Sequence, residues 1–162
     1  MLVPFNEIPG NARVWIFQSS ALLDESQISE LKRLSESFVE GWTAHHRELK
    51  AAFTVVDNMF LVFSVDESLT GASGCSIDKL HQFVKGREQA MQIQLLNRLL
   101  VALHTMDGPA VFRLSDAADK IEKGELDPQQ LVYDCTVTSK SAFDNHFVTP
   151  LSSTWLSRYL PS

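Results

Sequence analysis

A β-hairpin over residues 49–65 is the feature that most constrains how this chain folds. Residues 49–56 alternate in hydrophobicity, and Ala51, Phe53 and Val55 share one face. Asp57 and Asn58 follow, and both side chains tolerate the positive φ that a two-residue hairpin turn requires. Residues 59–65 are almost wholly apolar, which is typical of a strand that is covered on both faces.

The elements on either side of this hairpin have clear patterns of their own. Residues 13–18 are rich in β-branched and aromatic side chains and are predicted to form a first strand. Asp24 and Gln27 have the spacing of a helix-capping box, and an apolar stripe follows at spacings of three and four residues. A second helix is expected after a loop of small residues at 68–76, whereas residues 95–103 fit a helix or a strand equally well.

The order of these elements predicts an α+β fold. Strand, helix, hairpin, helix and strand is the order of a ferredoxin-like α/β sandwich (β-α-β-β-α-β), which would extend to about residue 105. The last third would add a C-terminal helix-strand-helix extension. At 162 residues, without an internal repeat or linker, residues 1–162 are expected to form a single domain.

Composition and charge exclude several classes of protein. The formal net charge of −6 and the scattered Lys and Arg residues argue against nucleic-acid binding, which needs clustered positive charge. No apolar run approaches the ~20 residues that cross a bilayer, so membrane insertion is not expected. Cys75 and Cys135 are too few for a secreted disulfide framework, and they predict free thiols in the cytoplasm.

One segment, Ser-Gly-Cys-Ser-Ile-Asp at residues 73–78, could bind a ligand. It opens the second long helix, where unpaired backbone N–H groups and the helix dipole attract an anion. Gly74 would let a ligand approach the backbone, and the serine hydroxyls would add donors. The predicted ligand-binding residues are Ser73, Gly74, Cys75, Ser76, Asp78, Asp66 and Arg158.

The same segment has two further interpretations. It could be a helix cap without a ligand, in which Ser76 is the N-cap and Cys75 is a small buried hydrophobic residue. It could also hold a reactive thiol, with Cys75 as the nucleophile, Ser76 or backbone N–H groups stabilising the anion, and Asp66 or Asp78 handling protons. The nearby carboxylates oppose a thiolate by like-charge repulsion.

No motif for a metal or a cofactor is present. His45 and His46 are adjacent, so they point in different directions and make a poor metal pair. A phosphate-binding loop requires a Gly-Lys pair, and none occurs in this chain. Neither a metal nor a cofactor is therefore expected.

Several segments resemble a family of small bacterial proteins of about this length that are commonly labelled "ABC transporter ATPase". The resemblance covers nearly the whole chain and is most specific at residues 73–78; it also includes Trp155 and Arg158. It implies no catalytic residues. The ATPase label is not supported by the sequence, because an ATPase of that class needs a Walker loop and a signature motif.

The sequence therefore favours a soluble binding module without catalysis, which would take a small anionic ligand or a protein partner. The alternative is a thiol-dependent enzyme or redox sensor that uses Cys75 at a helix N-terminus. The ligand, the oligomeric state and the strand order are left open by the sequence.

Overall fold

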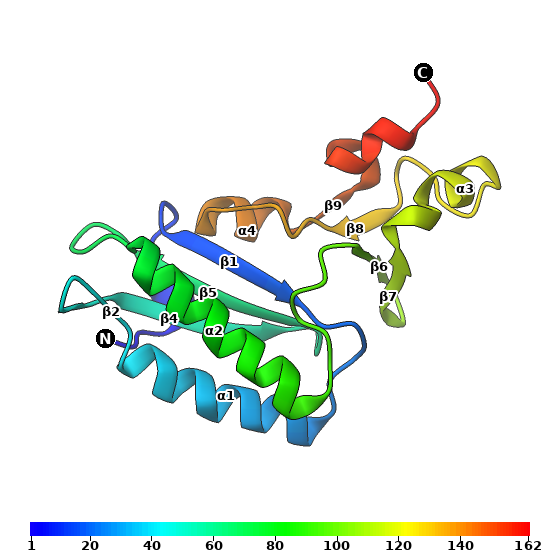
Figure 1. Ribbon diagram of the computed structural model, residues 1–162. Coiled ribbons are helices and arrows are strands. Elements are labelled where there is room, and N and C mark those ends of the chain that lie inside the picture. The colour runs from blue at the N-terminus through cyan, green and yellow to red at the C-terminus, as the bar shows by residue number, and fades with distance from the viewer.

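The computed structural model describes residues 1–162 and is built around two antiparallel sheets (Figure 1). The first sheet has the strand order β1-β5-β4, and the second has the order β7-β6-β8-β9. The strands of the first sheet are β1 (Arg13–Gln18), β4 (Lys50–Val56) and β5 (Phe60–Asp66). Those of the second are β6 (Leu100–Thr105), β7 (Gly108–Arg113), β8 (Leu131–Tyr133) and β9 (Val148–Pro150). A short ribbon pairs β2 (Thr43–Ala44) with β3 (Arg47–Glu48), and the fold is α+β as predicted.

The predicted hairpin is confirmed. Asp57 and Asn58 have φ values of 50° and 54°, and the Met59 N–H donates to the Val56 carbonyl over 3.1 Å. Every residue of β5 is buried, because this strand is central in its sheet and is covered on both faces. The first predicted strand is also confirmed, since β1 spans the predicted residues.

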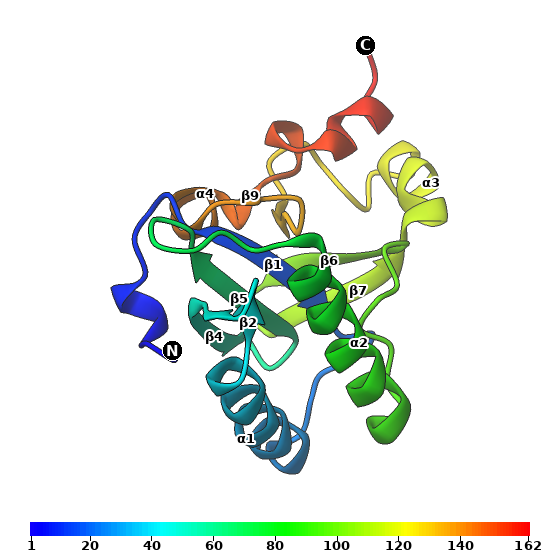
Figure 2. The same ribbon diagram turned by 60° about the vertical axis from the view of Figure 1, so that its left-hand side comes forward.

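Two long helices cover one face of the first sheet (Figures 1 and 2). Helix α1 (Glu25–Glu40) begins at the predicted capping box, in which the Gln27 N–H donates to Asp24 Oδ1 over 2.7 Å. Helix α2 (Gly74–Met91) lies beside it. The core between these helices and the sheet includes Leu31, Val39, Leu61, Phe63, Val65, Leu80 and Val84. None of the helices combines the length and the hydrophobicity needed to cross a bilayer.

An aromatic cluster joins the first sheet to the second. Phe60 of β5 lies 4.4 Å from Tyr133 of β8 and 5.0 Å from Phe147, measured between ring centroids. Phe60 and its neighbours Met59 and Val62 are at most 1% exposed. The opposite faces of β5 thus contribute to two separate parts of the core.

Strand β6 lies in the second sheet and pairs with β7 and β8. Strand β6 therefore does not pair with β1. The outer edge of β1 is occupied by a segment without regular structure: the Val14 N–H donates to the Thr138 carbonyl over 2.9 Å, and Arg13 forms an isolated bridge with Ser139. The ambiguous residues 95–103 divide into a loop and the first part of β6.

The C-terminal third contains more strand than predicted. Besides α3 (Ala117–Glu122) and β8, it holds β7, β9, α4 (Lys140–His146) and the short 3-10 helices η2 (Leu114–Asp116), η3 (Leu151–Ser153) and η4 (Trp155–Tyr159). Pro109 is tolerated in β7 because that strand lies at an edge of its sheet, where one side of the backbone makes no strand pairing. The predicted helix-strand-helix extension is therefore too simple.

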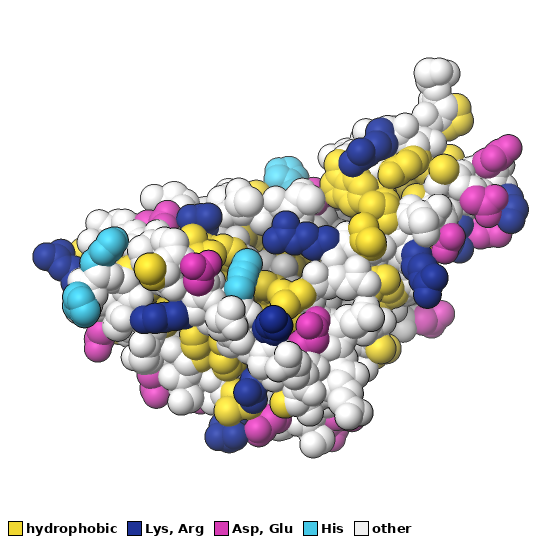
Figure 3. All heavy atoms as spheres, viewed as in Figure 1, with side chains coloured by type: hydrophobic (Ala, Val, Ile, Leu, Met, Phe, Trp, Pro, Cys, Tyr) yellow, Lys and Arg dark blue, Asp and Glu magenta, His cyan; other side chains and the backbone are white.

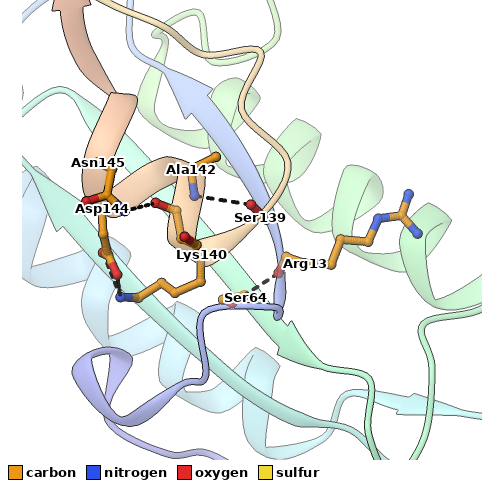
Figure 4. A network of polar contacts seen from close by, with 8 residues as sticks. Arg13, Ser64, Ser139, Lys140, Ala142, Asp144 and Asn145 are labelled. Carbon is orange, nitrogen blue, oxygen red and sulfur yellow. Dashed lines mark hydrogen bonds and ion pairs between the residues drawn. The ribbon is translucent and has the colours of Figure 1, made fainter.

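A small polar network surrounds the start of helix α4 at the edge of β1 (Figure 4). The Ala142 N–H donates to the N-cap Ser139 Oγ over 3.1 Å. Lys140 is only 6% exposed, and its ammonium group pairs with both carboxylate oxygens of Asp144 at 2.7 Å. On the other side of β1, the Ser64 hydroxyl donates to the Arg13 carbonyl over 3.0 Å. The chain before α4 is held beside β1 by backbone hydrogen bonds, from the Val14 N–H to the Thr138 carbonyl over 2.9 Å and from the Lys140 N–H to the Ala12 carbonyl over 2.8 Å.

Candidate functional site

The predicted segment 73–78 forms the first turn of α2, and its hydroxyl groups are used within the helix cap. Ser73 is the N-cap, which corrects the alternative that placed Ser76 there. The Ser76 N–H donates to Ser73 Oγ over 3.2 Å, and the Ser73 N–H donates to Ser76 Oγ over 2.8 Å. Trp42 Nε1 also donates to the Ser76 carbonyl over 2.8 Å. The hydroxyl groups of both serines are therefore already paired within the chain.

Other members of this segment face solvent. Cys75 is exposed, so the alternative that described it as a buried hydrophobic residue is wrong. Asp78 and Gly74 are also exposed, and a Cβ atom added at Gly74 would meet nothing within 4 Å. Gly74 is not required for steric reasons in the structure as it stands.

Asp66, at the end of β5, stabilises the loop that leads to α2. Its carboxylate accepts a hydrogen bond from the Ser68 N–H over 3.1 Å and pairs with the Lys50 ammonium group, also at 3.1 Å. Hydrogen bonds from Ser68, with a smaller contribution from Lys50, lower the pKa of Asp66. Asp66 thus has partners from its own chain.

Arg158 lies on η4, far from the first turn of α2 (Figure 1, red). Its exposed guanidinium group stacks on Trp155 at 5.1 Å and on Tyr159 at 5.6 Å. Figure 3 shows hydrophobic side chains gathered over this C-terminal segment, with a Lys or Arg side chain against them. The structure does not bring Arg158 to residues 73–78. Trp155, on the same short helix, belongs to a different site.

That site is a cavity of about 400 Å³ along the outer edge of β1, between the two sheets. Its walls come from β1, from His81 of α2, from residues 95–98 before β6, from residues 132–138 and from residues 154–156. Fourteen of the 22 lining residues are hydrophobic. Segments far apart in the sequence therefore form one largely apolar site.

Two tryptophan side chains line this cavity. Trp15 comes from β1 and Trp155 from η4, and both are half-buried. Trp15 packs edge-on against Trp42, and their ring centroids are 5.9 Å apart. The cavity thus offers aromatic surface from two separate elements.

Gln18 is the most informative polar residue of the lining. It is 8% exposed, and its Oε1 atom accepts a weak hydrogen bond from the Cys135 thiol over 3.7 Å. Its Nε2 atom is shielded from solvent and has no partner. Buried donors are rarely unpaired in folded proteins, and an unbound ligand is one explanation for such an atom.

His81 is a second such residue. Its Nε2 atom is also shielded and unpaired, while its ring packs edge-on against Phe17 with centroids 5.7 Å apart. Two residues of the cavity lining, one from β1 and one from α2, thus each carry a shielded nitrogen atom without a partner.

Two further titratable groups of the lining, Cys135 and Tyr133, have raised pKa values. Burial raises the pKa of the Cys135 thiol to about 12, and the Asp134 carboxylate adds to the shift. Burial and a hydrogen bond to Asp57 raise the pKa of Tyr133 above its ordinary value. Arg98, by contrast, lines the cavity without a carboxylate within 4.0 Å.

The sequence prediction did not include Gln18, His81 or Arg98 in the site. A polar residue at the end of an apolar strand was the only local sign of Gln18. No group of three or more His, Cys, Asp or Glu side chains is arranged to hold a metal ion.

No protein-family model, no curated protein and no solved structure matches this chain. The functional interpretation therefore depends on the geometry of the chain itself.

Proposed function

We propose that this protein binds a small amphipathic molecule in the cavity between its two sheets. The observation that carries this proposal is the buried, unpaired amide nitrogen of Gln18, a residue that lines a mostly apolar cavity. The cavity volume of about 400 Å³ falls in the lower part of the ~300–1,000 Å³ range of ligand sites. An unpaired donor in such a place is costly in the free protein and becomes favourable once a ligand pairs with it.

Binding is a better description of this cavity than catalysis. The Cys135 thiol, with its raised pKa of about 12, is protonated at neutral pH and is a poor nucleophile. The Tyr133 hydroxyl is engaged by Asp57. These two groups therefore shape the cavity wall instead of attacking a ligand.

A thiol-based function at Cys75 is the second candidate, and the exposure of this thiol favours it. Cys75 lies outside the cavity lining, so the two candidates use different sites and can be tested separately.

We also propose that the first sheet and its two helices are related to the ferredoxin-like fold. The first sheet with α1 and α2 has the β-α-β-β-α part of a ferredoxin-like arrangement in the strand order β1-β5-β4, and residues 138–139 occupy the edge where its fourth strand would pair. The resemblance to the small bacterial family and the cytoplasmic location remain predictions.

The cavity can be tested with the aromatic sulfonate 8-anilinonaphthalene-1-sulfonate, whose fluorescence rises in apolar sites. The wild-type protein should bind it saturably, and Thr138→Trp should abolish binding by filling the cavity from an exposed position of its wall. The control is Thr70→Trp, which adds the same side chain outside the cavity. Equal binding by both variants, or no binding by the wild type, would contradict the proposal.

A further inference from the structure

We infer, on the basis of the proposed binding function, that the ligand is a small aromatic carboxylate. The inference follows from which polar groups of the lining lack partners in the chain: two are the shielded nitrogens of Gln18 and His81, and the third is the exposed guanidinium group of Arg98. All three can donate hydrogen bonds, and an anion with oxygen acceptors is their natural complement.

The orientation of the Gln18 amide determines the first donor. The protonated Cys135 thiol donates to Oε1, which leaves the NH2 group of Gln18 without an acceptor. A ligand that pairs with this group must therefore supply an acceptor oxygen. A ligand that offers only donors would leave Nε2 unpaired.

Arg98 is the third hydrogen-bond donor of the lining. Arg98 has no carboxylate partner within 4.0 Å, and it is the only Lys or Arg residue of the lining. Asp134 is the only carboxylate of the lining, and its Oδ1 atom accepts from both the backbone N–H and the hydroxyl group of Thr136. Arg98 is exposed, so its guanidinium donors are free to pair with an anionic ligand, while the formal charges of Arg98 and Asp134 balance within the lining.

Pairing of the two shielded nitrogens requires side-chain rotation. Gln18 Nε2 and His81 Nε2 are closed off from water in the free protein, but both residues line the cavity. The last torsion of each side chain is broad in energy, so a turn toward the cavity is inexpensive when an acceptor is present. Ligand binding should therefore be accompanied by local reorientation of these side chains.

The apolar lining determines the body of the ligand. Trp15 and Trp155 contribute aromatic surface, and hydrophobic residues supply most of the remaining wall. Aromatic rings pack favourably against such surfaces at their faces and edges. A flat hydrocarbon body with one carboxylate matches both the apolar wall and the hydrogen-bond donors of the cavity.

Three probes of equal shape and different charge test this inference by isothermal titration calorimetry. They are 2-naphthoate, 2-acetylnaphthalene and 2-naphthylmethylamine, which carry an anion, a neutral acceptor and a cation. We expect 2-naphthoate to bind about tenfold more tightly than the ketone, as a charge-assisted hydrogen bond predicts, and the amine to bind most weakly.

Variants assign the preference to individual residues. Arg98→Gln should reduce the preference for 2-naphthoate over the ketone, whereas Gln18→Met should weaken both acceptors by a similar factor. The control for charge is Arg47→Gln, because Arg47 is also exposed and lies on β3, outside the cavity lining. Each variant should keep the wild-type far-ultraviolet circular dichroism spectrum, which shows that it is folded.

The outcomes separate this inference from the proposed function. Equal affinity for all three probes, or a preference for the amine, would overturn the carboxylate inference while leaving the cavity as a binding site. If none of the three binds, the inference is wrong, and the sulfonate experiment with Thr138→Trp decides whether the cavity binds anything.

Discussion

The hydroxyl group of Tyr133 on β8 donates a hydrogen bond to the Asp57 carboxylate in the β4–β5 turn. This bond connects the two sheets at a point where the Tyr133 ring also contacts Phe60. The turn that makes the hairpin recognisable in the sequence thus also holds the second sheet in place. The cavity lies between these sheets, so its shape depends on this connection.

Removal of this hydroxyl group should destabilise the protein. Tyr133→Phe leaves the ring in the aromatic cluster but removes a hydrogen bond to a charged acceptor, which typically contributes about 1.5–3 kcal/mol. Urea unfolding should therefore show a lower free energy of unfolding. Tyr159→Phe is the control, because no hydrogen bond to its hydroxyl group is present. Equal stability of the two variants would show that the Tyr133–Asp57 bond contributes little.

Acid should weaken the loop between β5 and α2. The pKa of Asp66 is lower in the folded protein than its ordinary value of about 3.9, so its ionised form is stabilised by folding. That stability is present above the unfolded pKa and is lost as the pH falls through the folded pKa. Asp66→Asn should therefore be less stable than the wild type at pH 7, with a smaller difference at pH 3.

The comparison for this pH series is Asp78→Asn, which removes a carboxylate that is exposed. It should follow the wild type at both pH values in urea unfolding. A parallel loss of stability in all three proteins as the pH falls would show that Asp66 has no specific part in acid sensitivity.

Gln18→Met should stabilise the free protein. The substitution removes a buried amide donor without a partner, whose presence costs about 1–3 kcal/mol, and it sacrifices only a weak thiol hydrogen bond. Chemical unfolding should show a gain of about 1 kcal/mol. Gln129→Met, at an exposed position, should change little. A loss of stability in Gln18→Met would mean that the amide is already satisfied in solution.

The two thiols should differ strongly in reactivity. Iodoacetamide reacts with thiolates, and the pKa of about 12 leaves Cys135 almost fully protonated at pH 8. Mass spectrometry should find rapid modification of Cys75, which is exposed, and slow modification of Cys135. Cys75→Ser should therefore be nearly inert, and fast labelling of that variant would place Cys135 in a more accessible environment.

Local signals in the sequence were sufficient for the parts of the fold that depend on neighbouring residues. The Asp57-Asn58 turn and the Asp24 capping box are such cases, because their chemistry is complete within a few residues. At the start of α2, by contrast, Ser73 and Ser76 are both capable caps. Only the backbone geometry decides that the earlier serine is the N-cap.

The sequence could not predict the partner strand of β6 or the cavity, because both depend on long-range contacts. Strand β6 is equally apolar whether it joins β1 or β7. Gln18 and His81 gain their significance from missing partners, which depend on side chains distant in sequence, such as Cys135. An unpaired donor leaves no pattern in the residues on either side of it.

The position of Trp155 has a consequence for protein synthesis. Every other wall of the cavity comes from residues up to Thr138, whereas residues 154–156 supply the last one. Residues 154–156 are synthesised after both sheets, so the cavity lacks this wall until they emerge from the ribosome. The ability to retain a ligand should therefore be acquired only when residues 154–156 fold against the other walls.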